Sequence, residues 1–113
     1  MAFTPSIVPQ DDDTVYLVED DYGRIGRCWR ETEASEADRS TTIDYLYRGE
    51  FNDPVRVVAF NIREGWARDV SSEIAAELQR RADLAGEELT GSAARFVADH
   101  ASSRQLALRL VQR

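Results

Sequence analysis

The residues best suited to binding a ligand are arginines, a tryptophan and an aspartate in two short stretches of the chain. A guanidinium group binds carboxylates and phosphates in a bidentate manner, and an indole ring stacks on aromatic groups. The second stretch lies between a predicted strand and a predicted helix, where free backbone N–H groups favour anions. The pattern predicts a small pocket for an anionic or aromatic ligand. Its candidate residues are Arg27, Arg63, Trp66, Arg68 and Asp69.

The alternative interpretation of these residues is structural. Arginines in an acidic protein commonly pair with the protein's own carboxylates, and such surface pairs contribute little to binding. Tryptophans commonly pack in the core, where they bury a large apolar area. The sequence leaves both interpretations open.

Residues for acid–base or nucleophilic chemistry are scarce. The chain holds one histidine, His100, and one cysteine, Cys28, and it has no lysine. The absence of lysine excludes Schiff-base chemistry and the lysine of a phosphate-binding loop. We expect His100 to stabilise the last turn of a helix and Cys28 to be a small core residue. No catalytic residue is therefore predicted.

Two groups of aspartates could offer oxygen ligands to calcium or magnesium. They are Asp11-Asp12-Asp13 and Asp20-Asp21, and neither has the glycine-spaced pattern of an EF-hand loop. The segment YLVEDD, residues 16–21, resembles the opening strand of response-regulator receiver domains. The later strand ends in Asn61 where those domains have a phosphoacceptor aspartate, and their lysine is missing. We therefore interpret Asp20-Asp21 as a solvated turn and predict no metal and no cofactor.

The acidic composition limits the classes of partner. The 113 residues include 14 basic and 21 acidic ones, a net charge of −7, which disfavours contact with nucleic acid and with anionic membranes. The excess of acid lies in residues 11–50, whereas residues 51–113 hold nine acidic residues and nine arginines. The neutral half is the more favourable side for contact with another chain. A single cysteine and the lack of a signal-peptide pattern predict a cytoplasmic protein.

One stretch organises the rest of the chain. PVRVVAF, residues 54–60, is apolar on both alternating faces and predicts a central strand. A turn at Glu64-Gly65 follows, and then an amphipathic helix over about residues 70–86. Before the central strand, TVYLVE (14–19) and RIGRCWRE (24–31) predict a β-hairpin. A helix that ends at Gly49 comes next, opened by Ser35 and Asp38 in the manner of a capping box.

The last quarter of the chain is predicted to be helical. Residues 92–101 have helical spacing, and Ser102-Ser103 either interrupts that helix or caps a last one. The tail RQLALRLVQR, residues 104–113, has leucines that also alternate as in a strand, and we predict a helix there.

These elements predict an α+β fold in the order β-β-α-β-α-α. The expected sheet has three strands, mainly antiparallel, in the order 2-1-3, and three or four helices pack on it. We expect a flexible lead over residues 1–13, one domain over 14–101 and a helical tail over 102–113. Such a sheet leaves two open edges, which a second copy could cover, so we expect a homodimer.

Two segments, DDYGRIGRCWRET and PVRVVAFNIREGWARDVSSEIAAEL, resemble a family of small uncharacterised bacterial proteins. The resemblance covers roughly residues 14–100. It implies a cytoplasmic protein with no assigned activity, so no site residue follows from it.

The pattern as a whole favours a non-catalytic binding or regulatory protein that acts through protein–protein contact, with itself and with another protein as partners. The alternative is a small anionic-ligand-binding protein or minor enzyme that uses the turn from Arg63 to Asp69. A third hypothesis is that the surplus of carboxylates competes for a basic partner as a nucleic-acid mimic would, with salt-sensitive binding.

Overall fold

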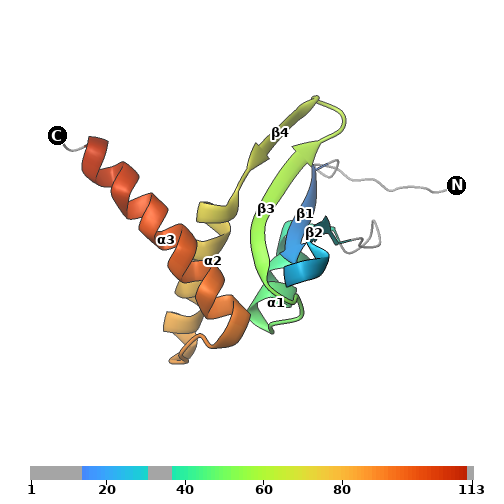
Figure 1. The fold of residues 1–113 in the computed structure, drawn as a ribbon. Helices are drawn as coiled ribbons and strands as arrows, with labels where there is room; N and C mark the ends of the chain where they lie inside the picture. Colours follow the sequence, from blue (N-terminus) through green and yellow to red (C-terminus); the bar gives the residue numbers. More distant parts are fainter. Residues whose placement is uncertain (1–13, 31–36, 112–113) are drawn as a thin grey trace, which may run out of the picture.

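The computed structural model describes residues 14–30 and 37–111, with side chains up to residue 101. The chain forms two strands, a helix, two further strands and two helices (Figure 1). In order they are β1 (Thr14–Asp21), the short 3-10 turn η3 (Gly23–Ile25), β2 (Arg27–Trp29), α1 (Arg39–Tyr47), β3 (Pro54–Asn61), β4 (Trp66–Asp69), α2 (Ser71–Ala85) and α3 (Gly91–Val111). The predicted lead, residues 1–13, lies outside the described residues.

The sheet has the order β2-β1-β3-β4, and every neighbouring pair is antiparallel. The α+β class and the order of the first three strands are confirmed, and the expectation of three strands was wrong. The fourth strand is β4, a stretch that the sequence had placed in the turn before α2. Two of its four residues are charged, so it carries no clear strand period. The β3–β4 turn forms it: the Asn61 side chain accepts the Glu64 N–H at 2.7 Å, and Gly65 takes a φ of 72°.

The core lies between the helices and one face of the sheet. Alternate side chains of the central strands, Val18, Val57 and Ala59, are buried on that face. The helices contribute Ile43, Leu46, Ile74, Leu78 and Phe96, each no more than 1% exposed. β3 is therefore an interior strand, as its apolar sequence predicted, and it packs against α2 and α3.

The helix ends follow local side-chain chemistry. Asp38, not Ser35, is the N-cap of α1: its carboxylate accepts the Thr41 N–H at 3.0 Å. Ser35 lies outside the described residues. α2 begins where the Asp69 carboxylate accepts the Ser71 N–H at 2.8 Å, and it ends at Gly86 with a φ of 68°. The range predicted for α2 is correct to within one residue at each end.

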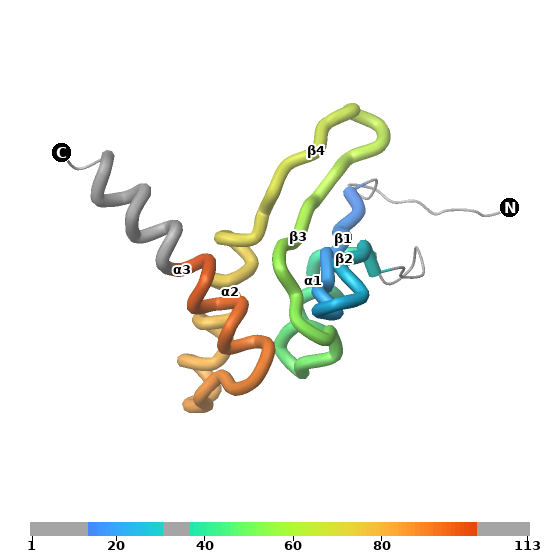
Figure 2. Tube along the Cα trace, in the orientation of Figure 1, coloured from blue at the N-terminus to red at the C-terminus, as the bar shows by residue number. Residues whose placement is uncertain are grey.

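α2 and α3 form a helical hairpin beside the sheet, and the β3–β4 hairpin extends past them (Figures 1 and 2). The backbone of α3 stays helical through Ser102 and Ser103, so the predicted interruption there is absent. The tail is part of this one helix up to Val111. In the described part of the chain no helix is long and apolar enough to cross a membrane.

Candidate functional site

The structure separates the five predicted ligand-binding residues. Four of them lie in the β3–β4 hairpin: Arg63 in its turn, and Trp66, Arg68 and Asp69 on β4. Arg27 lies on β2, at the opposite edge of the sheet, with β1 and β3 in between. Neighbouring strands are about 4.8 Å apart, so three strand spacings, roughly 14 Å, separate Arg27 on β2 from the candidate residues on β4.

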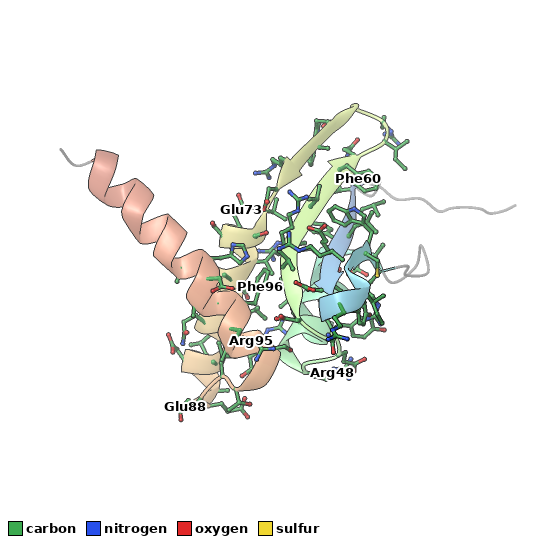
Figure 3. The ribbon with its side chains drawn as sticks, viewed as in Figure 1. Arg48, Phe60, Glu73, Glu88, Arg95 and Phe96 are labelled. Atoms are coloured by element: carbon green, nitrogen blue, oxygen red, sulfur yellow. The ribbon has the colours of Figure 1, made fainter. Side chains whose placement is uncertain are left out.

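The hairpin residues form a cluster in which charge is balanced. The Arg68 guanidinium lies over the Trp66 ring, 5.6 Å from its centroid, and pairs with Glu73 at 3.1 Å. The Trp66 indole N–H donates to Glu64 at 2.7 Å, and its ring packs against the edge of the core. Figure 3 shows Glu73 at the start of α2, facing the end of β4. An anion at Arg68 would therefore compete with the Glu73 carboxylate for this guanidinium.

The other two predicted residues also have internal partners. Asp69 accepts the Ser71 N–H and so starts α2. Arg27 pairs with Asp21 at 3.6 Å on the surface of the hairpin β1–β2. These contacts favour the structural interpretation of the arginines, and the ligand-binding role stays a prediction.

The most buried carboxylate in the described residues is Asp20, which the sequence had assigned to a solvated turn. That assignment was wrong, because Asp20 is fully buried. It accepts the Arg30 guanidinium at 2.9 Å, the Asn52 N–H at 2.9 Å and the Asp53 N–H at 2.6 Å. Only Asp21 matches the expected turn, where it accepts the Gly23 N–H at 2.8 Å.

Electrostatics keep Asp20 ionised. Burial alone would raise its pKa, but the N–H groups of Asp53 and Asn52 and the Arg30 guanidinium outweigh that effect. The pKa of Asp20 therefore lies below its ordinary value. All the donors belong to the protein itself, so this carboxylate ties β1 to the entry of β3 and is not available to a ligand.

His100 and Cys28, the one histidine and the one cysteine of the chain, have different surroundings. His100 contacts the Val55 carbonyl oxygen through Nε2 at 2.8 Å, and its ring lies 4.5 Å from that of Phe96. It therefore joins α3 to β3. Cys28 is exposed on β2, so the expectation of a core cysteine was wrong. β2 is an edge strand of three residues, all exposed, and an edge that short has no buried face.

No group of three or more histidine, cysteine, aspartate or glutamate side chains in the described ranges could hold a metal ion. Asp11-Asp12-Asp13, one of the two predicted metal candidates, lies outside those ranges. In the other, Asp20-Asp21, the carboxylate oxygens accept backbone N–H groups and pair with Arg30 and Arg27.

The second face of the sheet was not predicted from the sequence. Paired residues on neighbouring antiparallel strands point to the same side. Val15 pairs with Phe60 and Leu17 with Val58, so these four side chains share the face opposite Val57 and Ala59. We call them the open face. All four are half-buried, and none belongs to the core cluster under the helices.

The open face continues into a polar and aromatic margin. Glu19 pairs with Arg56 at 2.8 Å, and the Arg56 guanidinium lies over Trp29, which is 41% exposed. Figure 3 shows Phe60 on the side of β3 away from Phe96, which lies between α3 and the sheet. The signal in the sequence was the apolar character of both faces of PVRVVAF, which we had interpreted only as interior position.

Comparisons of the chain with family models, with curated proteins and with solved structures found no match. The resemblance to small uncharacterised bacterial proteins therefore stays a prediction.

Proposed function

We propose that this protein is a non-catalytic binding protein that acts through protein–protein contact, and that it does so as a homodimer. One observation carries the proposal: two central strands present Val15, Leu17, Val58 and Phe60 together on a face that no helix of the described chain covers. A contiguous apolar surface on a small domain is typical of a protein contact site.

The margin of the open face suits the same role. Glu19 and Arg56 neutralise each other, so the face carries no net field that would repel a protein of either charge. Trp29 adds a half-exposed indole beside them, and tryptophan is enriched in protein interfaces. Two of the candidate arginines, Arg27 and Arg68, by contrast, already have carboxylate partners.

The test compares partners captured by the wild type and by Phe60→Lys. Phe60 is half-buried on the open face, so a charged tip can reach solvent without entering the core. Leu84→Lys is the matched control, because Leu84 is 75% exposed on α2. We expect a partner that the wild type and the control both bind, and that Phe60→Lys loses at least tenfold in affinity.

Thermal unfolding of both variants shows whether each is folded. Equal binding by all three folded proteins would exclude the open face as the contact surface. Stabilisation of the wild type by a small anion, without any protein partner, would favour the alternative ligand-binding function.

A further inference from the structure

A groove of about 510 Å³ is lined by residues of α2, of α3 and of the loop that connects them. Its floor is apolar: Leu89, Val97 and small side chains along α3, among them Ala94, Ala98 and Ala101. Small side chains at this spacing let another helix approach closely. Ala98 is exposed, and Ala94 and Ala101 are half-buried, so the groove is open to an incoming segment.

The rim of the groove is acidic. Asp83, Glu87 and Glu88 line it at the end where α2 and α3 are connected, and no arginine lines it. Figure 3 shows Glu88 at that end of the helical hairpin. Two of the carboxylates are held in place: Asp83 accepts the Gln79 amide at 2.9 Å, and Glu87 accepts the Tyr47 hydroxyl at 2.6 Å.

The chain itself contains a segment of the opposite character. Residues 102–113, SSRQLALRLVQR, hold three arginines, three leucines and no acidic residue. Their backbone continues α3 as a helix to Val111. α3 has 21 residues and α2 has 15, so α3 is about 9 Å longer at a rise of about 1.5 Å per residue. The two helices run in opposite directions, so the end of α3 passes the start of α2.

We infer that the basic end of α3 in one copy of this chain docks in the acidic groove of a second copy, and that the second copy returns the same contact. This inference rests on the proposed homodimer and names its surface. An antiparallel pair of α3 helices places the C-terminal arginines of one beside the connecting loop of the other, where the three carboxylates lie. Helical spacing in the sequence groups Leu106, Arg109, Leu110 and Arg113, which suits an alanine floor beside an acidic end, and a reciprocal contact closes the dimer about a twofold axis.

The charges make a sharp test possible. Asp83→Arg/Glu88→Arg reverses the charge of the groove and keeps the hydrogen bond between Glu87 and Tyr47. Arg109→Glu/Arg113→Glu reverses the charge of the tail. Each variant alone pairs like charges at both contacts of the dimer. A mixture of the two variants pairs opposite charges at both contacts. Sedimentation velocity at low and high salt measures the association, because screening weakens such contacts.

We expect a dimer of the wild type, at least tenfold weaker association of each variant alone, and wild-type association of the equimolar mixture. Ala76→Arg/Ala85→Arg is the control, because it adds arginines to exposed positions of α2 that do not line the groove. It should leave the dimer intact. Circular dichroism establishes that every variant is folded.

The contrary results are distinguishable. Variants that weaken association without rescue in the mixture would overturn the pairing of tail and groove. A dimer that neither variant affects but Phe60→Lys disrupts would place self-association on the open face and keep the homodimer. A wild type that stays monomeric at all concentrations would overturn the homodimer together with this inference, and would leave contact with another protein to be tested through the open face.

Discussion

Asp20 with Arg30 and Glu73 with Arg68 are both carboxylate–arginine pairs beside an aromatic ring. Arg30 lies over Phe51 at 5.3 Å, and Arg68 lies over Trp66 at 5.6 Å. The distances between charged atoms are also similar, 2.9 and 3.1 Å. The surroundings differ: Asp20 is fully buried, whereas the Glu73 side chain is 54% exposed.

This difference teaches where the energy of such a pair comes from. An exposed pair exchanges water for a partner at nearly equal free energy. A buried carboxylate has no such exchange, so every donor that it accepts must be present. Asp20 accepts hydrogen bonds from two backbone N–H groups and one guanidinium, so its removal leaves three donors beside the start of β3 without this acceptor.

The largest effect should come from Asp20→Ala. It leaves the Asn52 and Asp53 N–H groups without their acceptor and removes the partner of Arg30, so we expect a loss of about 3 kcal/mol in the free energy of unfolding. Chemical denaturation measures it. Asp21→Ala is the neighbouring control and should cost under about 1 kcal/mol, because Asp21 caps an exposed turn. Equal losses for the two variants would contradict the contrast between buried and exposed carboxylates.

Ser71→Ala should follow in size. The Ser71 hydroxyl is buried and accepts the Val57 N–H at 2.8 Å, which joins α2 to β3 close to the exposed Arg68 pair. Its loss leaves a buried N–H unsatisfied and should cost about 1–3 kcal/mol. Ser72→Ala, one residue along and half-buried, should cost less. A Ser71→Ala protein as stable as the wild type would show that burial does not set the size of the loss in unfolding free energy at this position.

The pH dependence of stability sharpens the comparison further. The pKa of Asp20 lies below its unfolded value, so its stabilisation is complete above the unfolded pKa, about 3.9, and is lost as pH falls through the folded pKa. The difference in unfolding free energy between the wild type and Asp20→Asn should therefore be constant above about pH 5 and shrink as pH falls below about 4. A difference that grows on acidification would contradict this sign.

Arg68→Gln should have the smallest effect. Its pair with Glu73 is solvent-exposed, so we expect a change of under about 1 kcal/mol, similar to that of Arg27→Gln at the other edge of the sheet. The same two proteins test the ligand prediction. Phosphate that raises the melting temperature of the wild type and of Arg27→Gln, but not of Arg68→Gln, would assign an anion site to the hairpin.

Local pattern was sufficient for most of the fold. The β-branched run of PVRVVAF and the apolar spacing of residues 70–86 predicted β3 and α2 because each pattern repeats over several turns or pleats. β4 was missed because its pairing depends on the turn before it and on a vacant edge of β3. Asp38 was present in the predicted cap, one turn later than the residue chosen to open it.

The candidate site was harder to predict, because its members come from separate strands. Arg27 and Arg68 look equivalent in the sequence, and the order β2-β1-β3-β4 puts them at opposite edges of the sheet. Asp20 looks like half of an acidic turn, and its acceptors are filled by N–H groups of residues 52 and 53. The distance along the chain between these partners exceeds any local pattern.

The amino-acid sequence by itself determined which segments become strands and helices, because periodicity and capping act over a few neighbouring residues. Only the tertiary structure decided which carboxylates are buried, which arginines pair with which carboxylates and which apolar face stays open. Those outcomes depend on strand order and on distant contacts such as those of Asp20 with Asn52 and Asp53, which are 32 and 33 positions away along the chain. The solvation of a buried charge is set by the groups that pack around it in space.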